Sequence, residues 1–279
     1  MPTLEFSQIV EPALIGINRA WVFMGLGVNA SLDPDCSGFR LPDLDHIKLL
    51  PDDMPKAIVE EFKREFGMWV VSNGLRELIE TWDVFLDQLY YAAVYTDYWQ
   101  QSQETAKLSP EPFMKRATAF AREGTREKLE RLQKQFGITL QYQAEIESIK
   151  KARNCLTHRM GTVGPKDVEP GTSLTVRWRS PELFGINEDG TEFVPPLDSF
   201  PIHFPMGSPV KFRNVNRAKV VSLGDRLKFL PAEVKELCYT FRIAVDDARE
   251  AFTGLVLRSG GTIALPPIDP MSTSLDAGE

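Results

Sequence analysis

The chain has 279 residues, with 32 lysines and arginines against 39 aspartates and glutamates, and its formal net charge is −7. Apolar residues make up 43% and charged residues 25%, a globular composition that excludes a wholly disordered, fibrous or membrane-embedded chain. The acidic balance excludes wholesale electrostatic binding of nucleic acid but permits a local basic cleft. Three distant cysteines without a CxxC pair predict no disulfide framework and no cysteine zinc site, and they favour a cytoplasmic setting.

The most apolar stretch, residues 12–30, is interrupted by Asn18, Arg19 and three glycines. It falls short of the roughly 20 clean apolar residues that a membrane span needs, and acidic residues stand where a signal peptide would be basic. We therefore expect residues 1–30 to hold a buried N-terminal helix, with no membrane as partner. Residues 31–55 are rich in Asp and Pro, which predicts a long surface loop.

From residue 56 to about 160 the apolar residues recur at helical spacing. Gly67 is expected to end or bend the first of these helices. The next carries two apolar stripes, which is typical of a helix at the centre of a bundle. The helices predicted here cover residues 58–66, 75–92, 110–136 and 140–160.

Residues 161–230 lose the helical period. Leu174, Val176 and Trp178 alternate with polar residues and predict a half-buried strand. A turn is predicted at 187–190 and a hairpin over 220–229. A last helix is predicted to start at Pro231, with Glu233 near its positive end, and the tail, 259–279, is predicted to be disordered.

These patterns together predict a mainly α fold. A helical bundle is formed by residues 56–160 and 231–258, and a small β-rich insertion, residues 161–230, precedes the last long helix. The last helix needs the bundle to cover its apolar stripe, so the insertion is an excursion between two bundle helices. The apolar excess of the bundle helices predicts a symmetric homodimer.

The segment from residue 145 to 159 carries the chemistry. On a helix of about 100° per residue, Arg153 falls in the sector of Ile146 and Ile149. A guanidinium there is costly unless it meets a carboxylate, a phosphate or a solvent-filled cleft. Asn154 and His158 are four residues apart and are therefore neighbours on an adjoining face.

Basic side chains surround these three residues. Lys150, Lys151 and Arg159 join Arg153, so residues 145–159 hold four basic groups against two acids, a local net charge of 4 − 2 = +2. On an acidic chain, such a concentration predicts a local site for a polyanion.

The pattern Arg153-Asn154-x-x-x-His158, near the end of a helix in a helical bundle, resembles the signature of the HEPN superfamily. In that family an Arg, four to six other residues and a His mark the active site. The order of helices over 56–160 and 231–258 is also similar, whereas the insertion departs from the minimal family fold. The resemblance implies a metal-independent RNA endonuclease, active in defence or as a toxin, with two protomers forming one composite cleft.

Under this interpretation, His158 transfers a proton, Arg153 holds the scissile phosphate and Asn154 orients one or the other. Lys150, Lys151 and Arg159 bind RNA. No cofactor and no metal are expected, since the RNA supplies its own nucleophile in the 2′-OH and the chain has no HExxH. The expected partners are RNA, a second copy of the chain, and an antitoxin or other partner protein.

One family regulation does not carry over. Some members are toxins paired with a nucleotidyltransferase antitoxin that modifies a tyrosine two residues after the motif histidine. The chain has Met160 at this position.

A structural interpretation stands beside the catalytic one. Arg153 would pair with an acid on a neighbouring helix, the candidates being Glu77, Glu80 and Asp83, and His158 would favour the helix C-terminus through the dipole. The chain would then be a non-catalytic HEPN-like interaction module. A small-molecule binding protein, with residues 161–230 as a lid, is a third class that no residue supports specifically.

Two further features are assigned to packing. The aromatic residues between Trp82 and Trp99 lie at helical spacing and are expected in the core and dimer surface rather than in base stacking. Cys155 is expected to be a small packing residue rather than a nucleophile.

Overall fold

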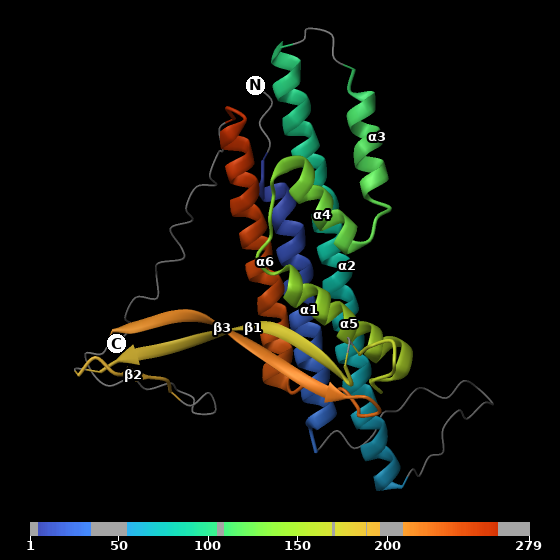
Figure 1. The fold of residues 1–279 in the computed structure, drawn as a ribbon. Helices are drawn as coiled ribbons and strands as arrows, with labels where there is room; N and C mark the ends of the chain where they lie inside the picture. Colours follow the sequence, from blue (N-terminus) through green and yellow to red (C-terminus); the bar gives the residue numbers. More distant parts are fainter. Residues whose placement is uncertain are drawn as a thin grey trace, which may run out of the picture. The chain divides into compact units, whose positions relative to one another are not determined.

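The computed structural model describes residues 5–34, 55–104, 109–168, 171–187, 189–195 and 209–261. Within these ranges the chain is mainly helical, with six helices and one small antiparallel sheet (Figure 1). This confirms the predicted mainly α chain with a small β-rich part. The helices are α1 (Ser7–Leu32), α2 (Lys56–Glu104), α3 (Glu111–Phe120), α4 (Thr125–Phe136), α5 (Gln143–Arg159) and α6 (Pro231–Arg258).

The chain divides into two compact units. Unit 1 comprises Met1–Ala13, Asp83–Leu140 and Asp246–Glu279, and unit 2 comprises Leu14–Trp82 and Gln141–Val245. The boundary cuts across α1, α2 and α6. The candidate motif and the whole sheet belong to unit 2.

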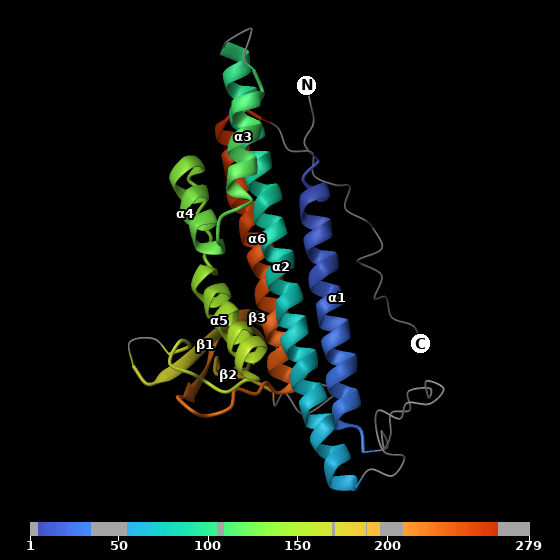
Figure 2. The ribbon, with the colours of Figure 1, turned by 90° about the vertical axis from the view of Figure 1, so that its right-hand side faces the viewer.

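In unit 2, α1 and the first half of α2 lie side by side (Figure 2). The structure corrects the prediction that Gly67 ends or bends a helix, because α2 runs through it unbroken. Gly67 instead permits close approach of α1, since a Cβ there would lie 2.8 Å from Ser31 Oγ. Gly27 serves the same purpose, because its Cβ would lie 2.7 Å from the side chain of Val70.

The N-terminal helix is the one described helix that is long and apolar enough, by length and composition, to cross a membrane. In the structure Ile17, Ala20 and Met24 on α1 are buried, while Val22, Phe23 and other apolar residues of the same helix are exposed.

In unit 1, the single helix predicted over 110–136 is wrong, because α3 and α4 are separated at residues 121–124. The break lets both helices bring an aromatic ring to Tyr90 of α2. Tyr90 stacks on Phe120 with ring centroids 3.8 Å apart, and it meets Phe136 edge-on at 5.5 Å. Its hydroxyl donates to Gln135 Oε1 at 2.7 Å. The predicted assignment of Trp82 and Tyr90 to the core is confirmed, since both are buried.

The sheet has the strand order β2-β1-β3, with β1 at Ser173–Ile186, β2 at Glu192–Phe193 and β3 at Val210–Ser222. The central strand β1 pairs antiparallel with β3 from Ser173 opposite Ser222 to Gly185 opposite Val210. The strand predicted at 174–178 is therefore confirmed as part of a longer one.

The hairpin predicted over 220–229 is wrong. After the turn at Gly224 the chain pairs with residues 161–163, directly after α5, through a bridge between Thr162 and Arg226. Val163 N donates to Asp225 O at 2.9 Å, and Leu227 N donates to Gly161 O at 2.8 Å. The end of the motif helix is thus held by the return of the β insertion.

The sheet lies against α5 and the first half of α6 (Figure 1). On the α6 side, Trp178 Nε1 donates to Glu236 at 2.5 Å, and Arg179 N donates to Thr240 Oγ1 at 2.9 Å. The last helix begins at Pro231, as predicted, and Glu233 in its first turn accepts from Leu230 N at 2.7 Å. The predictions for the tail and for most of the 31–55 loop lie outside the described residues.

Candidate functional site

One face of α5 is closed by the sheet. Ser148 Oγ accepts from Arg177 N at 2.8 Å, and Glu145 accepts from Arg179 Nε at 2.8 Å. Ala152 and Cys155 are fully buried on the same side. Burial raises the pKa of the Cys155 thiol to about 11, with a further contribution from Asp167. The expectation that Cys155 is a packing residue fits this buried and protonated state.

The helix ends where the sequence placed its end. Met160 has φ 48° and Gly161 has φ 83°, both in the left-handed region, and Gly161 N donates back to Cys155 O at 3.2 Å. A Cβ at Gly161 would lie 3.0 Å from Leu227 O, so glycine is required both for its conformation and for close approach. The final turn of α5 therefore has a fixed position in unit 2.

Arg159 contributes to this fixation. Its guanidinium forms a bidentate ion pair with Asp167, whose side chain is 3% exposed and also accepts from Gly164 N at 2.9 Å. The hydrogen bonds that Arg159 donates to Asp167 raise the pKa of Arg159 further above its already high ordinary value. The sequence predicted an RNA contact here, and the structure assigns the side chain a structural contact that the sequence did not reveal.

Arg153 differs from every comparable arginine. Six arginines of the described residues are partly buried, and the five that form ion pairs are Arg116, Arg131, Arg159, Arg179 and Arg213. Arg153 is the sixth, and its Nε is buried without a hydrogen-bond partner. An unsatisfied buried donor costs about 1–3 kcal/mol, so a site that retains one calls for an explanation.

The acids proposed as structural partners of Arg153 are engaged elsewhere. Glu77 pairs with Arg19, Glu80 pairs with Arg76 at 3.6 Å, and Asp83 accepts from Thr125 at 2.8 Å. Within the described part of the chain, Arg153 has no carboxylate at ion-pair distance. The pairing that would make this residue purely structural is therefore absent from these ranges.

His158 is exposed in the last turn of α5, and Asn154 is partly buried one turn before it. Neither side chain has a hydrogen bond or ion pair with another described residue. Arg153 and His158 are five residues apart, which places them about 140° apart around the helix, with Asn154 on the arc between them. One chain thus presents the three residues around the end of a helix rather than on a single face.

Of the two lysines of the motif helix, Lys150 falls within this arc and Lys151 falls just beyond His158. Lys151 is exposed and Lys150 is partly buried. Arg159 of the same segment is held by Asp167, so it is not available for the RNA contact that the sequence predicted.

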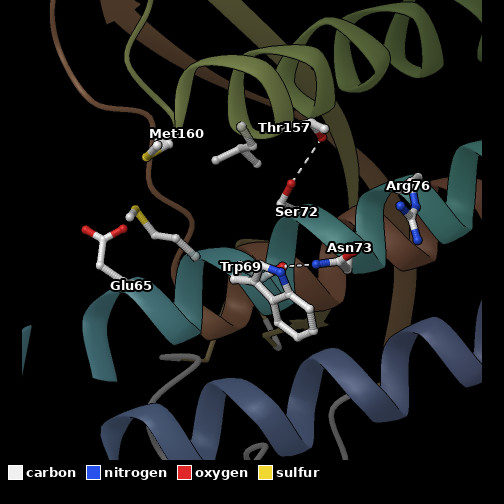
Figure 3. A pocket seen from close by; sticks show the side chains of 9 residues that line it. Glu65, Trp69, Ser72, Asn73, Arg76, Thr157 and Met160 are labelled. Carbon is white, nitrogen blue, oxygen red and sulfur yellow. Dashed lines mark hydrogen bonds between the residues drawn. The ribbon is translucent and has the colours of Figure 1, made fainter. Parts of the chain in front are cut away.

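A depression of about 410 Å³ lies between α2 and the end of α5 (Figure 3). It lies on the side of α5 that carries Arg153, because Thr157, one turn after Arg153, lines it. Thr157 and Ser72 are joined by a hydrogen bond of 3.1 Å between their hydroxyls. The lining residues are Glu65, Met68, Trp69, Ser72, Asn73, Arg76, Leu156, Thr157 and Met160.

Sequence reasoning missed this depression, including Trp69 and Asn73. The available signal was the apolar stripe of the first part of α2, which continues at helical spacing from Phe62 and Phe66 to Trp69. All three rings are exposed. A stripe that stays exposed in the folded unit is a surface feature rather than a core feature.

In the described ranges, no group of three or more His, Cys, Asp or Glu residues is arranged to hold a metal ion. Of the three histidines, His46 and His203 lie outside those ranges. Comparison of the chain with protein-family models, with curated proteins and with solved structures found no match. The functional interpretation therefore depends on the motif and its geometry.

Proposed function

We propose that the protein is an RNA endonuclease similar to the HEPN superfamily, with Arg153, Asn154 and His158 as its site residues. The observation that carries the proposal is the state of Arg153. It is the one partly buried arginine of the described residues without an ion pair, and it lies within two helical turns of an exposed histidine. A phosphate of RNA supplies the missing charge-assisted partner.

The chemistry follows from these residue types. The 2′-oxygen of the RNA attacks the adjacent phosphorus while His158 removes or returns a proton. The P–O5′ bond breaks, which leaves a 2′,3′-cyclic phosphate on one product and a protonated 5′-hydroxyl on the other. Arg153 stabilises the charge that develops on the phosphate oxygens, and Asn154 orients the phosphate or the imidazole. Lys150 and Lys151 attract the RNA backbone.

The angle between the two principal residues favours a composite site. Because Arg153 and His158 are about 140° apart on α5, a phosphate in contact with one residue is best reached by the other from a second chain. Unit 2 also exposes an apolar surface on α1, at Ile15, Val22, Phe23 and Leu26. We propose a symmetric homodimer in which each cleft combines Arg153 of one protomer with His158 of its partner.

Complementation tests this arrangement. Arg153→Ala and His158→Ala proteins are each expected to be inactive on single-stranded RNA. Co-expression of the two should restore cleavage, because one of the two clefts of the mixed dimer keeps both residues. Arg242→Ala serves as the control, since Arg242 is exposed on α6 and forms no ion pair with a described residue. Two active single variants, or a monomer in light scattering at micromolar concentration, would contradict the proposal.

The same preparation tests the metal question. Cleavage is expected to continue in excess EDTA, because the 2′-OH is the nucleophile and His158 moves the proton. Activity that is lost on chelation and restored by Mg²⁺ would contradict this mechanism. In the cell, we place this activity in the cytoplasm, in a defence or toxin role that involves an antitoxin or another partner protein.

A second candidate function is a non-catalytic HEPN-like interaction module. The exposed apolar residues of α1 and of the first part of α2 favour it, since apolar patches of this kind mark surfaces that bind proteins. A dimer whose wild-type chain cleaves no RNA would favour the interaction module over the nuclease.

A further inference from the structure

The depression between α2 and α5 has the size of a ligand site, and its lining includes Leu156 and Thr157, which follow Arg153 by one turn of α5. Its volume of about 410 Å³ falls in the range of small-molecule pockets. The α5 residues that line it, Leu156, Thr157 and Met160, surround the direction in which Arg153 leaves the helix. A molecule held by the Arg153 guanidinium can therefore extend into the depression.

Trp69 is the aromatic wall of the depression. Its side chain is 63% exposed, against 40% for Trp21, 3% for Trp178 and 1% for Trp82. Phe66 lies nearly parallel to the indole, with an angle of 19° between the rings and 6.3 Å between their centroids. The indole is thus oriented by a neighbouring ring while much of its surface remains open to solvent.

Two polar residues of the lining, Asn73 and Arg76, follow Trp69 along α2. Asn73 Nδ2 donates to Trp69 O at 2.8 Å, which fixes the amide beside the indole. Arg76 follows one turn later on the same side of α2, and its contact with Glu80 is an exposed pair at 3.6 Å. Figure 3 shows Trp69, Asn73 and Arg76 along α2, with Thr157 and Met160 across from them on α5.

An aromatic face, an amide and a guanidinium next to a phosphate position are the groups that recognise an unstacked nucleobase. We propose that the depression is a nucleobase subsite, in which the base next to the phosphate bound by Arg153 stacks on Trp69. This inference builds on the proposed function and deepens it. It makes single-stranded RNA the substrate, since a base inside a duplex is not available for stacking.

Binding of an RNA that cannot be cleaved tests the subsite without requiring activity. The probe is a single-stranded oligonucleotide with 2′-O-methyl groups, which lacks the nucleophile, and the readout is its affinity together with the quenching of tryptophan fluorescence. Trp69→Ala should weaken binding about 5- to 150-fold, the range for loss of one stacked base, and should abolish most of the quenching. Trp69→Phe should retain part of the affinity and lose the quenching.

Trp21→Ala is the matched control, because Trp21 is a partly exposed tryptophan of the same unit outside the depression. It should leave both affinity and quenching unchanged. The same oligonucleotide annealed to its complement should bind more weakly than the single strand.

The outcomes separate the two proposals. Weaker binding by Trp69→Ala together with a wild-type chain that cleaves no RNA would support the subsite and refute the nuclease. Cleavage by wild type, with affinity and KM unchanged in Trp69→Ala, would refute the subsite and leave the nuclease. Binding of the duplex as tight as that of the single strand would overturn the subsite. A Trp69→Ala protein that becomes monomeric but keeps its affinity for RNA would also overturn it, and would instead place Trp69 in the contact with a second copy of the chain.

Discussion

Aromatic and charged residues on or near α2 differ in burial and in pairing between unit 1 and unit 2. In unit 1 Tyr90 is buried between Phe120 and Phe136, and its hydroxyl is hydrogen-bonded. In unit 2 Trp69 is exposed on the same helix. The same sequence pattern of aromatic residues at helical spacing thus forms a core at one end and a surface at the other.

The charged residues repeat the contrast. Lys128 in unit 1 has a side chain that is 4% exposed, and it pairs with Asp87 at 2.7 Å. Arg153 in unit 2 is partly buried and has no ion pair among the described residues. Because other buried charges of the described residues are matched within the chain, the unmatched Arg153 is the basis of the proposed phosphate contact.

The largest effect is expected from His158→Ala. Loss of a general acid or base reduces cleavage by about 10²–10⁴-fold. The free energy of unfolding should change by less than about 0.5 kcal/mol, because an exposed side chain without described contacts contributes little to stability. Cleavage rates and urea unfolding measured on the same preparation check both parts. Cleavage at the wild-type rate by a folded, dimeric His158→Ala protein would show that His158, at the end of α5, is not a catalytic residue.

Asp87→Ala tests the matched charge of unit 1. It leaves the buried Lys128 ammonium without its carboxylate, which is expected to lower the free energy of unfolding by about 3 kcal/mol. Glu130→Ala is the control, since its pair with Arg126 is exposed and should contribute less than about 1 kcal/mol. Urea unfolding measures both losses. Equal losses in the two variants would show that the buried ion pair of Lys128 contributes no more to stability than an exposed pair.

The two buried thiols, Cys155 on α5 and Cys238 on α6, allow a test of burial by the pH dependence of alkylation. Burial raises the pKa of Cys155 to about 11 and that of Cys238 to about 12, from an ordinary value of 9.0. At pH 8 a shift of two units lowers the thiolate fraction about 100-fold, so alkylation should be at least that much slower than in the urea-unfolded chain. The experiment uses a Cys36→Ser background, with mass spectrometry to locate the label.

The sign of the pH effect on stability follows from the same shifts. The folded state favours the protonated thiol, so this contribution is complete below pH 9 and is lost as the pH rises from about 9 to 11. Rapid alkylation of Cys155 in the folded protein at pH 8 would show that the face of α5 packed against the sheet opens to solvent. The description of this face as closed would then be wrong.

A small effect on stability is expected from Arg153→Met. Methionine keeps an unbranched apolar side chain and removes an unsatisfied donor, so the free energy of unfolding should change by less than about 1 kcal/mol. Arg179→Met is the matched control, because it breaks the ion pair with the mostly buried Glu145 and should cost about 2–3 kcal/mol. If Arg153→Met were as destabilising as Arg179→Met, Arg153 would be a structural residue.

Much of the fold was predictable from local patterns. Pro231 in a first-turn position, with Glu233 after it, predicted the start of the last helix, and the alternation of Leu174, Val176 and Trp178 predicted the central strand. Local patterns failed where a distant residue decides the outcome. Gly67 reads as a helix end, but its neighbour is Ser31 on another helix, and a glycine is favoured there by close packing.

The site was predictable to a smaller extent. The motif named Arg153, Asn154 and His158 because residue types and spacing are visible in one sequence. The commitment of Arg159 to Asp167 was not visible, since either arginine of the segment has the same chemistry and only the folded chain shows which one is paired. Trp69 was missed because an apolar stripe does not reveal whether it will be covered.

The join between residues 161–163 and 225–227 fixes the end of α5 at the base of the β insertion. The far end of the sheet, where Gly185 pairs with Val210, lies twelve residues of β1 away from the first pair at Ser173. Because the join lies at the other end of the insertion, we expect a fused tag or fluorescent domain at that far end to leave the end of α5 in place.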